Sequence, residues 1–396
     1  MKITVHRPNQ IGGCITEIES KAGTRIVIDV GSNLPGNTNA EEVDIAKITR
    51  GCDGVFVTHY HGDHIGEFEK VDDKTPIHMG SVAHEIFLNL CEHLPDKDID
   101  TVKRFETFRP AERIRVGDMV VTPYRVDHSA YDSYMFLVQC EGKRILHTGD
   151  FRTHGWTGKG VNACLERYVK KVDILICEGT MLSRQGEELL SEYALSEKAT
   201  ELLRENRHVF VLCSSTNIDS IASFYKAAGK VRRLVVADRY QRLNMDIVSA
   251  STKSNVYKFP YVKIFWNGRQ DCIDEMRRRG FCMFVRPRSE KFKTIMREFP
   301  DSLLVYSMWK GYLKSETLDQ DIYDFIPKDA QGKLLFEYLH TGGHATEKAI
   351  IEMCELVRPD IIFPIHSKMP DRFEELESDN IKGKVQRLCS GKSVEI

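Results

Sequence analysis

The sequence predicts a mixed α/β protein in which one α/β domain is inserted into another. The first third of the chain contains short apolar runs that end in polar clusters, as in RIVIDVGSN and GVFVTHYHGDH, which is typical of strands in a layered α/β fold. From about Ser183 amphipathic helices alternate with buried strands, and past Lys333 the short-strand pattern returns. We therefore expect an inserted domain at residues 183–335, flanked by residues 1–182 and 336–396 of a single outer domain.

The individual elements follow from the same patterns. In the outer domain, residues 119–151 predict three strands with the hairpin turn EGK, and DILICEGT predicts a further strand. In the insert, residues 186–206 and 218–228 have the apolar spacing of helices, while HVFVL and RRLVVAD read as strands, as in a small doubly wound unit. After the insert, EKAIIEMCELV predicts a helix and DIIFPIHSK a strand that ends at a histidine.

Composition excludes several protein classes. The chain has 396 residues, of which 41% are hydrophobic and 29% charged, so it can bury a large core. The N-terminal residues form no apolar signal segment, and no run approaches the roughly 18 apolar residues of a membrane span. Eleven cysteines without a CxxC pair indicate reduced thiols and a cytoplasmic location; Cys177 and Cys213, for example, are interpreted as small buried hydrophobes.

Charge is distributed unevenly along the chain. Residues 226–297 contain 18 lysines and arginines against 6 acidic residues, although the net charge of the whole chain is −2. This block favours contact with a polyanion, and a plain solvated surface is the alternative. Aromatic residues between the basic ones, namely Tyr240, Phe281 and Phe284, could stack on bases or belong to the core.

The segment THYHGDHIG concentrates four possible metal ligands at the end of an apolar run: His59, His61, Asp63 and His64. Residues two apart in an extended chain point the same way, so His59 and His61 can reach one metal ion together. Other predicted strand ends supply His128, Asp150 and His366. A turn with this many imidazoles and no metal is the weaker interpretation.

These seven side chains predict a two-metal site. His59, His61 and His128 would hold one ion, Asp63, His64 and His366 the other, and Asp150 would lie between them. Two Zn²⁺ ions about 3.5–4 Å apart could hold a bridging hydroxide for phosphoryl transfer. Mn²⁺ is the alternative metal, because these ligand types separate it poorly from zinc.

The same motifs resemble those of a known family. THYHGDHIG, IDVGS with Asp29, VDHS with His128 and TGDF with Asp150 resemble, in order, the motifs of the metallo-β-lactamase superfamily. Further along, ICEGT with Glu178, HTGGHAT with His344 and PIHSK with His366 resemble motifs A, B and C of its β-CASP branch, whose members process nucleic acids. The resemblance implies an αββα sandwich with an inserted β-CASP α/β domain.

The resemblance also implies roles for single residues. Asp29 would orient the metal-binding loop, and Asp63 and Asp150 would act in catalysis as well as in metal binding. His344 would protonate the leaving oxygen, and Glu178 would hold His344 by a hydrogen bond. From the residues alone, the favoured interpretation is that His344 is a turn residue and Glu178 a carboxylate at a helix start.

Possible substrate contacts lie in the insert. Ser214, Ser215, Thr216 and Asn217 follow a strand and precede a helix, where they could bind a phosphate or simply cap the helix. The resemblance to ribonuclease J-like proteins suggests Ser307 as a further contact, but the Gly-Ser-Gln-Gly-Glu stretch of those proteins is lacking. The chain ends about 30 residues after His366, so we expect no ribonuclease J-type C-terminal dimerisation domain, and the oligomeric state stays open.

The predicted function is therefore that of a zinc-dependent phosphodiesterase acting on single-stranded nucleic acid, with no membrane partner. A histidine at motif C favours RNA, because the DNA-repair members of the branch tend to have valine there. Two alternatives stay open: a hydrolase of small esters, lactams or thioesters on the same metal core, and a non-catalytic nucleic-acid-binding subunit.

Overall fold

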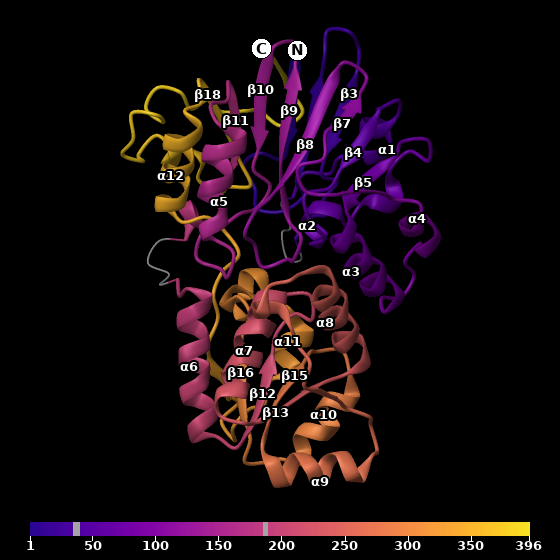
Figure 1. The fold of residues 1–396 in the computed structure, drawn as a ribbon, viewed down its shortest axis with the longest axis vertical. Helices are drawn as coiled ribbons and strands as arrows, with labels where there is room; N and C mark the ends of the chain where they lie inside the picture. Colours follow the sequence, from indigo (N-terminus) through magenta and orange to yellow (C-terminus); the bar gives the residue numbers. More distant parts are fainter. Residues whose placement is uncertain (35–39, 185–188) are drawn as a thin grey trace. The chain divides into compact units, whose positions relative to one another are not determined.

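The computed structural model describes residues 1–34, 40–184 and 189–396, and the chain forms two compact units (Figure 1). Unit 1 comprises Met1–Glu187 together with Gly343–Ile396, and unit 2 comprises Glu188–Gly342. The chain thus leaves unit 1 once and returns to it, which makes unit 2 an insertion.

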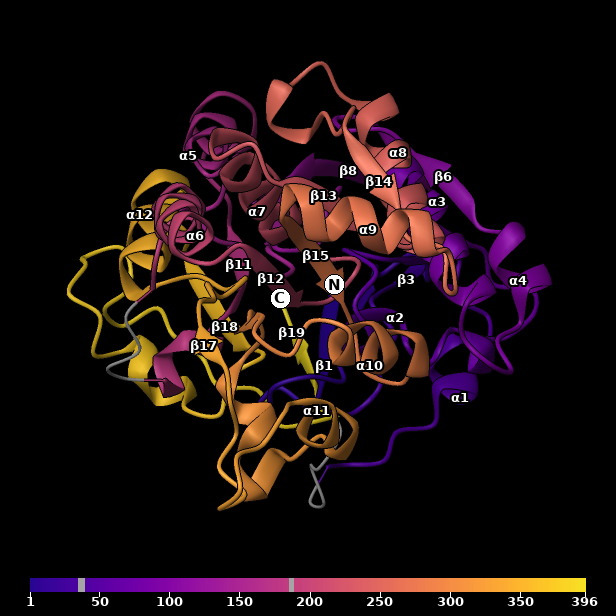
Figure 2. The same cartoon turned by 90° about the horizontal axis from the view of Figure 1, so that it is seen from below.

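The first sheet of unit 1 has seven strands in the order β19-β1-β2-β3-β4-β5-β6. The strands β19 to β3 pair antiparallel, whereas β3 to β6 are parallel. Because β1 pairs with β19, the two ends of the chain lie side by side (Figure 2). The strands are β1 (Lys2–His6), β2 (Ile15–Glu19), β3 (Arg25–Ile28), β4 (Gly54–Phe56), β5 (Ile77–Gly80), β6 (Glu106–Phe108) and β19 (Ser393–Glu395).

The second sheet of unit 1 has six strands in the order β18-β11-β10-β9-β8-β7. The strands β7 to β10 form an antiparallel meander, and β10, β11 and β18 are parallel to one another. The strands are β7 (Ile114–Val116), β8 (Met119–Arg125), β9 (Tyr134–Cys140), β10 (Lys143–His147), β11 (Ile174–Glu178) and β18 (Ile361–Ile365).

Two apolar layers hold unit 1 together. One cluster joins the two sheets face to face, with side chains such as Ile28 and Phe56 from the first and Phe136 and Ile176 from the second. The other covers the outer face of the second sheet with helices. The helices of unit 1 are α1 (Ile45–Thr49), α2 (Gly62–Ile65), α3 (Ser81–Glu92), α4 (Ile99–Lys103), α5 (Lys159–Cys164) and α12 (Glu347–Val357). Since α3 contacts β5 of the first sheet, helices flank both sheets, and the predicted αββα sandwich is confirmed.

Unit 2 is a parallel sheet in the order β14-β13-β15-β12-β16-β17. Its strands are β12 (His208–Leu212), β13 (Leu234–Ala237), β14 (Val262–Ile264), β15 (Phe281–Val285), β16 (Leu303–Tyr306) and β17 (Glu337–Tyr338). Its helices are α6 (Glu192–Glu205), α7 (Ile218–Lys230), α8 (Arg239–Ser251), α9 (Gln270–Arg279), α10 (Glu290–Arg297) and α11 (Gln320–Phe325). The start of the helix predicted at residues 186–206 falls at 186–188, outside the described residues.

Unit 2 is doubly wound because helices cover both faces of its sheet. Phe210 and Leu212 of β12 pack with side chains of α9, α10 and α11, while the alternate residues Val209 and Val211 are also buried. The helix α7 contacts β13 and β15 and packs on α6. Among the described residues, no helix combines the length and the apolarity needed to cross a bilayer.

Three loops of unit 1 approach one another closely at Gly31. The Gly31 N–H donates to the Cys14 carbonyl at 3.0 Å, and the Cys14 N–H donates to the Asp63 carbonyl at 3.0 Å. A Cβ atom at Gly31 would lie 1.8 Å from the Asp63 oxygen and 2.7 Å from the Cys14 nitrogen. Glycine is therefore required where the loop after β3 contacts the loop that carries His61 and Asp63.

We predict that Gly31→Ala lowers the free energy of unfolding by at least about 1–3 kcal/mol, because the backbone must move to relieve the clash. Denaturant unfolding measures the effect. Gly160→Ala is the matched control: a Cβ atom there meets nothing within 4 Å, and alanine in α5 should stabilise the protein by about 0.5–1 kcal/mol. An unchanged midpoint for Gly31→Ala would contradict the close approach.

Candidate metal centre

Three histidine nitrogens converge at one end of the sandwich. His59 follows β4, His61 precedes α2, and His128 follows β8. His61 Nδ1 lies 3.1 Å from His59 Nε2 and 3.2 Å from His128 Nε2. His128 donates from Nδ1 to the Gly343 carbonyl at 2.6 Å, which leaves its Nε2 with a lone pair directed at the other rings. Lone pairs facing one another at this distance suit a shared cation.

These three rings are neutral at physiological pH. Burial lowers the pKa of His61 to about 4, and it lowers the pKa values of His59 and His128 well below the usual value. A metal ion binds the unprotonated form of imidazole. The three rings are therefore available as ligands without first losing a proton.

Asp150, which follows β10, lies at the centre of the histidine cluster. Its carboxylate oxygens lie 3.3 Å from a ring nitrogen of His64, 3.4 Å from one of His344, and 3.9 Å from one each of His59, His128 and His366. The side chain is 2% exposed, and its Oδ1 has no hydrogen-bond partner among the described residues. Burial would raise the pKa of Asp150, but the charges of His64, His366 and His344 lower it well below the usual value, so the carboxylate is ionised.

A second group of possible ligands lies on the other side of Asp150. Asp63 Oδ2 is 3.3 Å from His366 Nε2 and 4.0 Å from His64 Nε2. Burial lowers the pKa values of His64 and His366, but the neighbouring acidic groups, including Asp150, raise both well above the usual value. Without a cation, this side of the centre therefore holds protons on its rings, and a bound metal ion would replace them.

The rings of His64 and His366 are each oriented by a further contact at Nδ1. Asp29 accepts from the Thr58 N–H at 2.7 Å and from the Thr58 hydroxyl at 2.9 Å, and its Oδ2 lies 2.7 Å from His64 Nδ1. His366 Nδ1 lies 2.6 Å from the Thr180 hydroxyl. Asp29 and His366 both have positive φ angles, 63° and 51°, which non-glycine residues adopt only when their surroundings hold them there.

His344 and Glu178 lie beside the cluster. Glu178 is fully buried and accepts hydrogen bonds from the N–H groups of Phe151, Thr180 and Ala345 at 3.0–3.2 Å. Its Oε2 also lies 3.3 Å from His344 Nδ1. His344 is 17% exposed, more than its partner, so its ring can meet a solvent-borne molecule while Glu178 cannot.

The structure thus brings together all the predicted ligand, catalytic and orienting residues of unit 1: Asp29, His59, His61, Asp63, His64, His128, Asp150, Glu178, His344 and His366. Their roles stay predictions. Three neighbours were not predicted: the hydroxyls of Thr58 and Thr180, and the thiol of Cys14. Thr58 directly precedes His59, but nothing in the spacing around Cys14 indicated its position.

The predicted substrate contacts lie in unit 2, at the carboxyl ends of β12 and β16. Asn217 caps α7 by accepting from the Ser220 N–H at 3.2 Å, and the hydroxyls of Ser214 and Thr216 lie 2.9 Å apart. In contrast, the hydroxyls of Ser215 and Ser307 are buried and have no hydrogen-bond partner among the described residues. Ser215 and Ser307 are therefore the members of the predicted set with free hydroxyls.

The basic block, residues 226–297, also lies in unit 2. Of the two roles that the sequence left open for three of its aromatic residues, base stacking is wrong. Tyr240, Phe281 and Phe284 are 6%, 0% and 0% exposed, so they belong to the core and cannot stack on bases. Tyr261 and Trp266, in the same block, are 83% and 51% exposed. Several arginines are paired, as Arg277 is with Glu298 at 2.7 Å, which reduces the net charge that the block presents.

Comparison with known proteins relates the chain to a family. Residues 24–211 match the family model described as beta-lactamase superfamily domain. Ribonuclease J of Helicobacter pylori strain B128 is 24% identical over 91% of this chain and 54% of its own length. The DNA cross-link repair protein SNM1 of Arabidopsis thaliana is 21% identical over 84% of this chain and 64% of its own length. The chain therefore spans about half the length of the ribonuclease J that it matches.

A solved structure shares the fold over the whole chain. A protein of unknown function from Enterococcus faecalis V583 superposes with a TM-score of 0.74 at 19% identity, covering 99% of both chains. This match shows the fold alone, whereas the family model and the ribonuclease J relatives confirm the resemblance to the metallo-β-lactamase superfamily and its ribonuclease J-like branch.

We predict that the chain binds divalent metal at this centre and that chelation destabilises it. Free metal at a hundred times Kd should raise the free energy of unfolding by about 2.7 kcal/mol over the stripped protein.

His128→Ala should bind less metal per chain, as measured by elemental analysis. His6→Gln is the control, because His6 contacts Glu17 in the first sheet and no residue of the cluster. Equal metal content in His128→Ala and wild type would contradict the assignment.

Proposed function

We propose that the chain hydrolyses phosphodiester bonds in single-stranded RNA, because residues 24–211 match the beta-lactamase superfamily domain model and a ribonuclease J is among its sequence relatives. The observation that carries the proposal is the Asp150 carboxylate surrounded by five histidines, with three ring nitrogens converging on one side of it. A relative named ribonuclease J matches 91% of the chain, which favours RNA over small esters or lactams.

The residues present fit a pair of metal ions. The buried atoms His64 Nε2 and Asp150 Oδ1 have no hydrogen-bond partner among the described residues, an unsatisfied state that metal binding would relieve. We assign His59, His61 and His128 to one ion, Asp63, His64 and His366 to the other, and Asp150 to both. When bound, two divalent ions, zinc in this proposal, stabilise negative charge on phosphate oxygens and lower the pKa of a water molecule.

His344 is proposed as the proton donor to the leaving oxygen. Its Nδ1 faces Glu178 and Asp150, so its Nε2 is the atom left for the substrate. Glu178 is a positioning residue, because three backbone N–H groups hold its carboxylate and only the remaining contact reaches His344. The 17% exposure of His344 allows the ring to reach a substrate at the surface of the centre.

We propose that unit 2 is a β-CASP domain and that it binds the RNA. The free hydroxyls of Ser215 and Ser307 lie at the carboxyl edge of a parallel sheet, where ligands gather in doubly wound folds. Tyr261 and Trp266 present exposed rings within the basic block and can stack on bases. A cytoplasmic location is part of the proposal, because all eleven cysteines are unpaired, as expected in a reducing compartment.

We predict that His344→Ala reduces cleavage of labelled single-stranded RNA by about 10²–10⁴-fold, the usual contribution of a general acid. Its metal content should stay at the wild-type value, which separates a lost proton donor from a lost metal site. His6→Gln again serves as the control. The substrate panel contains 5′-monophosphate and 5′-triphosphate RNA, matched DNA and a lactam, with product lengths resolved. Turnover of the lactam alone, or of nothing, would refute a ribonuclease.

We also predict that Ser307→Ala raises KM for RNA about 2- to 10-fold, as expected for the loss of one hydrogen bond to substrate, with little change in kcat. Steady-state kinetics at fixed salt measures both constants. Ser302→Ala is the matched control, because Ser302 precedes β16 at the end opposite Ser307. Equal KM values for the two variants would remove Ser307 from the substrate site.

A further inference from the structure

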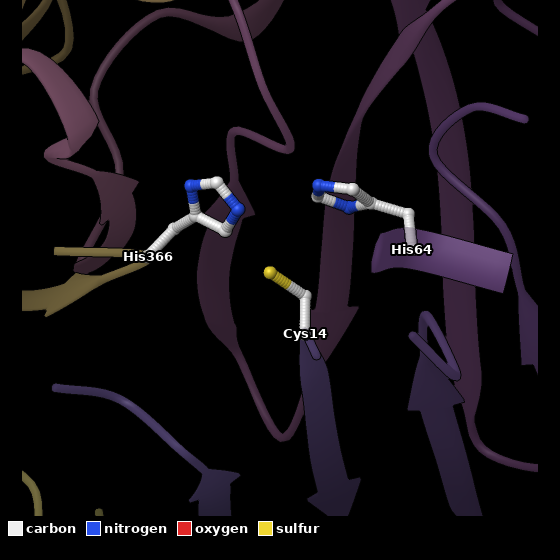
Figure 3. A group of neighbouring side chains, drawn as sticks. All are labelled: Cys14, His64 and His366. Atoms are coloured by element: carbon white, nitrogen blue, oxygen red, sulfur yellow. The ribbon is translucent and has the colours of Figure 1, made fainter. Parts of the chain in front are cut away.

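Within the described parts of the chain, Cys14 is the one thiol that lies among the ring nitrogens of the histidine cluster. Its sulfur and one ring nitrogen each of His64 and His366 all lie within 4.8 Å of one another. Figure 3 shows the sulfur pointing between the two rings, from the residue that precedes β2. Each of the three side chains comes from a different segment of unit 1.

The backbone holds this thiol firmly against the metal-binding loop. The Cys14 N–H donates to the Asp63 carbonyl at 3.0 Å, and the Cys14 carbonyl accepts from the Gly31 N–H at 3.0 Å. Asp63 and His64 are neighbours in the sequence, so the loop that presents them also fixes the backbone of Cys14. One side-chain torsion then decides where the sulfur lies.

A buried ring nitrogen, His64 Nε2, which lies 3.3 Å from the Asp150 carboxylate, faces the same position. His64 is 2% exposed, and its Nδ1 is occupied by the Asp29 carboxylate at 2.7 Å. Its other nitrogen, Nε2, has no hydrogen-bond partner among the described residues. The Nδ1 atom of His366 is likewise occupied by Thr180, and its Nε2 lies 3.3 Å from Asp63. Each ring thus presents one nitrogen on the side of Asp63 and Cys14.

Other cysteines have different surroundings. Cys177 and Cys213 are buried in strand ends, and burial raises the pKa values of both thiols, that of Cys213 to about 12. Such thiols act as small hydrophobes. Cys14 is only partly buried and borders two imidazoles, a set of donors that suits a metal ion.

We propose that the Cys14 thiolate is a ligand of the metal ion held by Asp63, His64 and His366. This inference rests on the metal centre assigned in the proposed function, and it adds a sulfur donor to that centre. On binding, the S–H bond breaks, a sulfur–metal bond forms, and the proton passes to solvent. A thiolate ligand favours zinc, and its analogues cobalt and cadmium, over manganese and magnesium. Cys14 would therefore decide the choice of metal that the other ligands leave open.

The test is reconstitution of the stripped full-length protein with Co²⁺. Bound cobalt shows visible bands with any ligands, but an intense near-ultraviolet charge-transfer band only with a sulfur ligand. Wild type should show both. Cys14→Ser should keep the visible bands and lose the charge-transfer band, and its affinity for Zn²⁺ should fall about tenfold or more while that for Mn²⁺ changes less. Cys164→Ser is the matched control, because Cys164 has the same intermediate burial in unit 1.

The outcomes separate the two proposals. Wild type that binds cobalt without the charge-transfer band overturns the role of Cys14 and leaves the nuclease proposal standing. A band that persists in Cys14→Ser also overturns it, because the sulfur then belongs to another cysteine. Wild type that binds no metal overturns both proposals. If Cys14→Ser does not fold, iodoacetamide labelling of wild type decides: bound Zn²⁺ should protect Cys14 and not the exposed Cys389, and equal labelling refutes the ligand.

Discussion

The structure of unit 1 depends on a concentration of negative charge that protonated histidines or bound cations must compensate. Asp29, Asp63 and Asp150 lie within one cluster of histidines, and Asp29 and Asp150 are almost fully buried. Burying carboxylates is costly unless cations or hydrogen bonds compensate them. Thr58 and His64 compensate Asp29, whereas Asp150 keeps an oxygen without a partner among the described residues. A bound metal ion would supply this compensation in place of the protons on the histidine rings.

The fold brings these groups together because strands of both sheets end at the same place. The parallel strands β3 and β4 deliver Asp29 and His59, and β10, β11 and β18, parallel to one another, deliver Asp150, Glu178 and His366. The apolar cluster between the sheets fixes the two sets of strand ends relative to each other. The polar site is thus positioned by the apolar residues of the strands that lead into it.

Much of this could be predicted from the sequence, because each ligand follows an apolar run and strand ends gather at one edge. The roles of Thr58 and Thr180 could not be predicted, because the sequence does not show which threonine hydroxyls contact site residues. No role could be predicted for Cys14, because only tertiary pairing with Asp63 and Gly31 reveals its neighbours. Tyr240, Phe281 and Phe284 stand among arginines in sequence, yet they face the core, because charge along a chain does not report burial.

The hydrogen bonds of Glu178 have a consequence for how such proteins diverge. Its carboxylate accepts from Thr180, shortly before the insertion leaves unit 1, and from Ala345, just after the insertion returns. Hydrogen bonds within unit 1 therefore hold together the two chain segments that flank the insertion. Evolution can lengthen, shorten or exchange the inserted domain without altering the spacing of its attachment points, so new specificities can arise on an unchanged reaction centre.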